Sequence, residues 1–110
     1  MIMCVPITSD GIVDPSWGRA DSIAVAEVQD GKIANWQVIE VSWNRLHDEG
    51  TSGSHHARVA KFLREHKVEV VVANHIGDGM VRMLDTMGLS ARLGAAGDAK
   101  AAVLAANLLS

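Results

Sequence analysis

Histidines are the side chains in this sequence best suited to bind a metal. Four of the five fall in predicted loops or at a predicted helix start, namely His47, His55, His56 and His75. Neutral imidazole is the commonest metal ligand in proteins, and loops let such rings converge. The spacing matches neither a zinc finger nor a metalloprotease motif. The pattern predicts a metal site without naming the metal, and the alternative of solvated loop histidines stays open.

The remaining histidine and the sulfur-containing residues favour structural roles. His66 lies near the end of a predicted helix, where a cation suits the helix dipole. Cys4 lies inside the apolar run 2–7, so it is interpreted as a small buried hydrophobe. Met80, Met83 and Met87 recur at helical spacing, which predicts core packing. One cysteine cannot form an internal disulfide, so nothing indicates an oxidising compartment.

Two glycine-containing segments have residue types that could bind an anion. Trp17, Gly18 and Arg19 form a loop segment with an apolar wall and a guanidinium fork. The alternative is that Trp17 pins the loop to the core and Arg19 pairs with a nearby aspartate. Gly77 and Gly79 precede a predicted helix and could present backbone N–H groups. Simple turn geometry is the alternative there, because no phosphate-binding fingerprint is present.

The sequence lacks the residue patterns of two common kinds of enzyme. No serine lies in a nucleophile-elbow pattern. A nuclease that holds divalent cations needs acidic residues on the first strand, and residues 2–7 contain none. The sequence therefore predicts a protein that is not an enzyme.

Length, charge and hydrophobicity indicate how many domains the protein has and which partners it lacks. The 110 residues suit one domain, 1–110, and the net charge is −3. Nucleic-acid binders usually carry a basic face, whereas Lys and Arg are scattered here, so nucleic acid is not expected as a partner. No stretch reaches the roughly 20 apolar residues of a membrane span. We expect a cytoplasmic protein without membrane contact.

The secondary-structure signals alternate between strand and helix in the second half of the chain. Asp30–Gly31 is a strong hairpin signal, Ser54 is a plausible helix N-cap, and Gly88 and Asp98 fit a C-cap and an N-cap. The predicted strands cover 2–7, 22–29, 32–42, 68–73 and 89–93; the predicted helices cover about 55–66, about 80–87 and 99 to the end, with 43–54 as a loop.

This order predicts an α/β fold. The two βα units require parallel strands, and the first three strands form a meander, so the sheet of about five strands is mixed. Helices on both faces give a three-layer α/β/α domain, with a strand order like that of ribonuclease H. Ligands collect beyond the carboxyl ends of parallel strands, where we expect the loops 8–21, 74–79 and 94–98 to converge.

Several segments in this order resemble a known family. They are the opening strand Ile2-Met3-Cys4-Val5-Pro6-Ile7, the loop Trp17-Gly18-Arg19-Ala20, the Asp30-Gly31 hairpin, the run from Val70 to Gly77, and Gly94 to Asp98 before an Ala-rich helix. Together they resemble the dinitrogenase iron-molybdenum cofactor biosynthesis family, which includes NifX- and NafY-like proteins and the C-terminal part of NifB. The resemblance covers nearly the whole chain.

The resemblance implies a ribonuclease H-like fold and a non-catalytic role in holding or carrying an iron-molybdenum cofactor, a metal-sulfur cluster or a metal ion. It implies that Trp17, Gly18, Arg19, Asn74 and Gly77 contact the cofactor, and that a cofactor-donor or acceptor protein is a partner. Two departures matter. Ser16 and Trp17 stand where the family often has His or Glu followed by Phe, and Asn74-His75 replaces a usual Gly-Gly.

These departures remove one potential ligand and add another, His75. A second hypothesis therefore accompanies the first: a module that binds a small anionic ligand or a protein partner without metal, through Arg19 and the Gly77–Gly79 turn.

Overall fold

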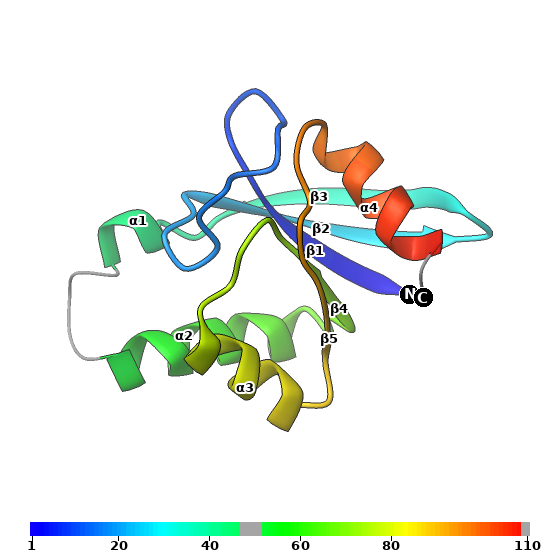
Figure 1. Ribbon diagram of the computed structural model, residues 1–110. Coiled ribbons are helices and arrows are strands. Elements are labelled where there is room, and N and C mark those ends of the chain that lie inside the picture. Colours follow the sequence, from blue (N-terminus) through cyan, green and yellow to red (C-terminus); the bar gives the residue numbers. More distant parts are fainter. Residues whose placement is uncertain (47–51, 109–110) are drawn as a thin grey trace.

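The computed structural model describes residues 1–46 and 52–108. It shows a mixed five-stranded sheet with helices on both faces (Figure 1). The elements along the chain are β1 (Ile2–Ile7), β2 (Ser22–Gln29), β3 (Lys32–Glu40), α1 (Trp43–Leu46), α2 (Ser52–Glu65), β4 (Val70–Val72), α3 (Asp78–Thr86), β5 (Ser90–Arg92) and α4 (Ala99–Leu108). The predicted α/β fold class is confirmed.

The sheet order is β3-β2-β1-β4-β5. The first three strands pair antiparallel, and β4 and β5 continue the sheet parallel to β1. Asp30 and Gly31 join β2 to β3 with φ of 53° and 75°, as a turn matched to the twist of a hairpin requires. The order is consistent with a ribonuclease H-like arrangement.

Each face of the sheet has its own hydrophobic layer. Cys4, Val25 and Val71 point to the face that α2 and α3 cover, where Leu63 and Leu84 complete the layer. The alternate residues of the same strands, including Met3 and Val5, point to the face covered by α4. This alternation follows from the two-residue period of a strand, and it produces the predicted three layers.

Two helix ends behave as predicted. Asp98 Oδ2 accepts a hydrogen bond from the Ala101 N–H at 2.9 Å, which caps α4. Gly88 follows the end of α3 with φ of 76°, a left-handed conformation that glycine adopts without strain.

Other predicted boundaries are wrong by a few residues. The parallel strands β4 and β5 are shorter than the predicted 68–73 and 89–93. Val68 is buried, but its N–H donates to Leu63 O and closes the end of α2. The apolar run 68–73 therefore correctly indicated buried residues, although not all of them belong to the strand.

The predicted loop 43–54 is also partly wrong. Trp43–Leu46 forms the short helix α1, and α2 begins at Ser52, which places Ser54 inside the helix instead of at its N-cap. α2 starts with Ser-Gly-Ser, which has no apolar periodicity. The helical pattern of apolar residues therefore begins only after the first turn, and the predicted helix started too late. Within the described ranges, no helix is long and apolar enough to cross a membrane.

Candidate functional site: a histidine pocket beside the parallel strands

A pocket of about 270 Å³ lies where the loop after β1, the start of α2 and the start of α3 meet. We call it the histidine pocket; its lining residues are Trp17, Gly18, His55, His56, Gly77, Gly79 and Met80. The loops that follow β1 and β4 leave the same edge of the sheet because these strands are parallel. Two of the three loops expected at this edge therefore contribute to one pocket.

The third expected loop, 94–98, lies beside the loop 8–21 but outside the histidine pocket. Val13 N–H donates to Gly97 O at 2.8 Å, and Ala99 N–H donates to Gly11 O at 3.0 Å. The predicted convergence of the loop 94–98 with the loop 8–21 is thus confirmed. The loop 94–98 supplies no residue to the histidine pocket, whose remaining wall comes from α2.

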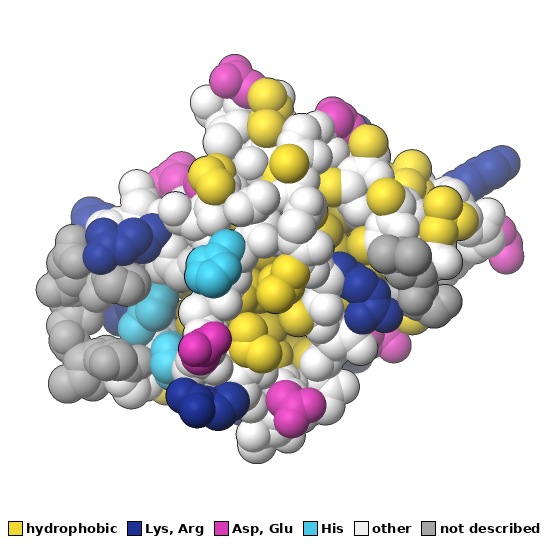
Figure 2. Space-filling model, in the orientation of Figure 1, with side chains coloured by type: hydrophobic (Ala, Val, Ile, Leu, Met, Phe, Trp, Pro, Cys, Tyr) yellow, Lys and Arg dark blue, Asp and Glu magenta, His cyan; other side chains and the backbone are white. Residues whose placement is uncertain are grey.

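His55 and His56 stand near the start of α2 and border the pocket with glycines opposite them. His55 is 5% exposed, and the two ring centroids are 6.5 Å apart. A Cβ at Gly18 would come within 3.3 Å of His55 Nε2, and one at Gly79 within 3.2 Å of His56 Cε1. The glycines therefore leave room for both imidazoles, and Figure 2 shows histidine side chains gathered on the side of the molecule where α2 begins.

An aromatic cluster holds one wall of the pocket. Trp43 packs edge-on against Trp17, with centroids 5.4 Å apart, and against Phe62 at 5.5 Å and His55 at 6.3 Å. Trp17 is only 2% exposed. It anchors the loop after β1 to the core, as one alternative predicted, and it also lines the pocket; its contact with a ligand stays a prediction. Its indole Nε1 is buried and has no acceptor in the described part of the chain.

Arg58 lies one helical turn beyond His55. Its Nη1 is 3.2 Å from His55 Nδ1 and also donates to Leu46 O at 3.4 Å. Sequence reasoning missed Arg58 as a site residue. The signal was its i, i+3 spacing from His55, which places two residues on the same face of a helix.

Several predicted site residues do not line the pocket. His75 and Arg19 are exposed and absent from its walls, and the Asn74 side chain donates to Ala95 O at 3.1 Å. His47 lies outside the described residues. Across residues 1–46 and 52–108, no group of three or more His, Cys, Asp or Glu is placed to hold a metal ion. Roles for His75, His47, Asn74 and Arg19 stay predictions.

Cys4 is fully buried in the layer under α2 and α3. Burial raises the pKa of the Cys4 thiol far above its ordinary value, because the low-dielectric core disfavours the thiolate. The thiolate is the form that binds metals. The prediction that Cys4 is a core residue is confirmed.

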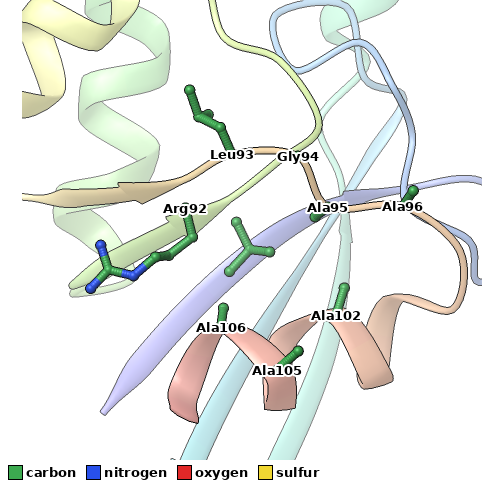
Figure 3. A pocket seen from close by; sticks show the side chains of 9 residues that line it. Arg92, Leu93, Gly94, Ala95, Ala96, Ala102, Ala105 and Ala106 are labelled. Carbon is green, nitrogen blue, oxygen red and sulfur yellow. The ribbon is translucent and has the colours of Figure 1, made fainter. Parts of the chain in front are cut away.

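A second concavity, of about 290 Å³, lies on the other face of the sheet between α4 and the ends of β4 and β5 (Figure 3). We call it the alanine groove; it is lined by Val72, Arg92, Leu93, Gly94, Ala95, Ala96, Ala102, Ala105 and Ala106. Figure 3 shows the Arg92 guanidinium pointing away from the alanines of α4. The groove offers alkyl surface beside the Arg92 side chain, whose buried Nε has no hydrogen-bond partner among the described residues, and it contains no imidazole, carboxylate or thiol.

A third depression, of about 480 Å³, lies between the loop after β1, the strands β2 and β3, and the start of α4. Three of its charged and aromatic side chains, those of Asp98, Lys100 and Trp36, already have intramolecular roles. Asp98 caps α4, and Lys100 Nζ lies 5.4 Å above the centre of the Trp36 ring. The histidine pocket is therefore the concavity with the most chemistry to offer a ligand.

Comparison with protein families agrees with this geometry. The family model described as dinitrogenase iron-molybdenum cofactor matches residues 1–107. The chain belongs to the dinitrogenase iron-molybdenum cofactor family. The resemblance predicted from the sequence is thereby confirmed over almost the whole chain. A comparison with curated proteins finds no significant match.

Solved structures similar to this member of the dinitrogenase iron-molybdenum cofactor family support the fold. The crystal structure of a protein named PH0822 has a TM-score of 0.76 at 20% identity, and the match covers 98% of this chain and 90% of that one. The NMR structure of a Thermotoga protein described as a candidate NifB protein has a TM-score of 0.71 at 18% identity, with 97% and 87% covered.

The apo form of the orange protein from Desulfovibrio gigas also has a TM-score of 0.71 at 18% identity, with 93% of this chain and 82% of that one covered. Identities this low establish a shared fold and do not carry ligands from one protein to another.

Proposed function

We propose that this protein binds and carries an iron-molybdenum-type cofactor or a related metal-sulfur cluster in the histidine pocket, without catalysing a reaction. The observation that carries the proposal is the pair of adjacent imidazoles, His55 and His56, that border a pocket at the carboxyl edge of the parallel strands. Membership of a family named for the iron-molybdenum cofactor supports it.

The lining residues suit a cargo that brings its own ligands. The pocket offers ring nitrogens from two histidines, beside the indole of Trp17 and the thioether of Met80. A structural zinc ion needs four protein ligands and a catalytic one needs three. A preformed cluster already has its metals coordinated by sulfur, so one or two imidazoles suffice to hold it. We therefore favour a cluster over a bare metal ion.

The same residues favour carriage over catalysis. The walls of the histidine pocket contain no carboxylate, hydroxyl or thiol. β1, the strand that would carry the metal-binding acids of a nuclease, consists of apolar side chains. A carrier needs a site that opens to partners, and Gly77 and Gly79 on the α3 side are exposed. We propose a cytoplasmic protein that receives its cargo from a donor protein and passes it to an acceptor.

Anaerobic reconstitution tests this function. The purified chain is incubated with iron, molybdate and sulfide, desalted, and assayed for metal content and visible absorption. The wild-type protein should retain metal and colour, and the double variant His55→Ala/His56→Ala should lose most of both. His66→Ala is the matched control because His66 follows the other end of α2, outside the pocket lining. Background values for the wild-type protein would refute the carrier function.

A separate His75→Ala variant decides whether the exposed histidine of the turn after β4 contributes. Reduced retention would add His75 to the site, and wild-type retention would limit the site to the pocket.

A metal-free anion site is the second candidate. Gly77 caps α3 without a side-chain hydrogen bond, so the first backbone N–H groups of α3 remain available to an anion. A thermal-shift panel of anions and nucleotides tests this idea. A shift that chelators do not alter and that Arg19→Ala abolishes would favour the anion site over the metal carrier.

A further inference from the structure

The contact between Arg58 and His55 determines which ring nitrogen of His55 carries a proton. Arg58 Nη1 lies 3.2 Å from His55 Nδ1. A guanidinium can only donate hydrogen bonds, because arginine stays protonated in proteins. Nδ1 must therefore accept. In a neutral imidazole the other nitrogen then bears the hydrogen, so His55 is the Nε2–H tautomer.

That nitrogen lies beside Gly18, which lines the histidine pocket together with His55. Nε2 is the atom that a Cβ at Gly18 would approach to 3.3 Å, and both Gly18 and His55 line the pocket. Trp17, on the same wall, has a buried indole N–H with no acceptor within residues 1–46 and 52–108. A buried donor that lacks an acceptor destabilises the folded state, because it loses its hydrogen bond to water. Two residues with buried ring nitrogens thus line one small volume.

A helix start faces the same volume. Gly77 and Gly79, which begin α3, line the pocket, and no side chain caps this end of the helix. The orphan N–H groups of the first turn carry partial positive charge. Donors therefore come from the wall formed by His55 and Trp17 and from the start of α3, which suits an acceptor atom with negative charge.

We propose that Arg58 is a positioning residue that fixes His55 as a hydrogen-bond donor, so that His55 and Trp17 bind an acceptor atom of the cargo while His56 offers a ring nitrogen to its metal. The inference rests on the carrier function and divides the two histidines into different roles. The acceptor atom is an oxo or sulfido group bound to a metal. Such a group occurs both on a free tetrahedral metallate and on the surface of a metal-sulfur cluster.

The tautomer can be measured on the protein without any cargo. The chain is labelled with ¹⁵N-histidine, and a two-bond ¹H–¹⁵N correlation spectrum is recorded at about pH 8, where an ordinary imidazole is neutral. We expect His55 to be the Nε2–H form, with an Nδ1 resonance that moves in Arg58→Met as its donor is lost. An Nδ1–H form, or no change in Arg58→Met, would overturn the inference whether or not the protein carries a cluster.

Binding tests the consequence for the cargo. Retention of the reconstituted cargo and affinity for molybdate are measured in wild type, Arg58→Met, Trp17→Phe and Arg64→Met. The first two variants each remove one donor or its support, and we expect each to weaken binding about tenfold, a typical value for one hydrogen bond. Arg64→Met is the matched control, since it removes the same charge from an exposed position of α2.

The two probes separate the possible sources of the acceptor atom. A loss confined to molybdate indicates a free metallate, and a loss confined to the reconstituted cargo indicates a cluster surface; both support the donor role. Equal binding by Arg58→Met and Arg64→Met with both probes would overturn it. If the wild-type protein binds neither probe, the carrier function itself fails, and the tautomer measurement still decides the role of Arg58.

Discussion

The histidine pocket and the alanine groove have nearly the same volume, about 270 and 290 Å³. Both lie near the carboxyl ends of parallel strands, on opposite faces of the sheet. One is bordered by two imidazoles, an indole and the start of a helix, and the other by alkyl groups and the stem of Arg92. Volume and position therefore do not identify the site in this fold; the polar atoms at the walls do.

The difference arises from the helices that cover each face. α4 is rich in alanine, and its small side chains let it lie close to β1 and β4. α2 begins with short polar residues and then places two histidines in succession at the end of the sheet.

Trp17→Ala should have the largest effect, because Trp17 is both a wall of the histidine pocket and part of the core. Truncation of a buried aromatic residue costs about 3–5 kcal/mol, and cargo retention should be lost as well. Urea unfolding measures the first effect. Trp36→Ala, at a half-buried tryptophan on β3, should cost clearly less, and an equal cost would show that Trp17 is not part of the core.

The pH dependence of stability tests whether the Cys4 thiol belongs to the core or to the pocket. Its folded-state pKa is raised by burial, so the thiol stays neutral in the native state while it ionises in the unfolded chain above about pH 8.5. The resulting stability is complete below that pH and falls at higher pH by up to about 1.4 kcal/mol per pH unit. Urea unfolding between pH 7 and pH 10 measures the slope.

Cys4→Ala removes the thiol and should remove this part of the slope. The native wild-type protein should also resist thiol reagents. Rapid modification of Cys4 in the native state would show that the thiol is accessible and reopen its role as a ligand.

Gly79→Ala should narrow the histidine pocket with little effect on the fold. The added methyl would lie 3.2 Å from His56 Cε1, and overpacking of about 1 kcal/mol would weaken cargo retention roughly fivefold. Gly77→Ala is the matched variant, because its methyl meets no atom within 4 Å. Retention assays should rank Gly77→Ala above Gly79→Ala, and the reverse order would argue against contact between the cargo and His56.

Ala105→Leu should have the smallest effect, although it fills part of the alanine groove. Ala105 is exposed on α4, leucine is a good helix former, and surface substitutions usually change stability by less than about 0.5 kcal/mol. Thermal unfolding and cargo retention should both match the wild type. A loss of retention would mean that the groove, and not only the histidine pocket, takes part in binding.

Sequence periodicity was sufficient for the sheet and its layers, because hairpin chemistry at Asp30–Gly31 and buried β-branched runs act locally. It was less accurate where local and tertiary signals differ. Val68 is buried yet closes a helix, and Ser54 has a capping side chain but lies within α2.

Only part of the candidate site could be predicted from the sequence. His55, His56, Trp17, Gly18, Gly77 and Gly79 were among the residues named from the sequence, and they meet in one pocket. Met80 was predicted only as a core residue, and it joins them because α3 packs beside α2 at the sheet edge, which no local pattern encodes. The contact of Arg58 with His55 Nδ1 in particular depends on side-chain conformations within one helical turn.

The central claim is that the histidine pocket holds a metal-containing cargo. Anomalous diffraction from crystals of the anaerobically reconstituted protein, collected at the iron and molybdenum absorption edges, tests it most directly. We expect an anomalous peak bordered by His56, Trp17 and Gly79. A peak in the alanine groove, or on His75 away from the pocket, would contradict it.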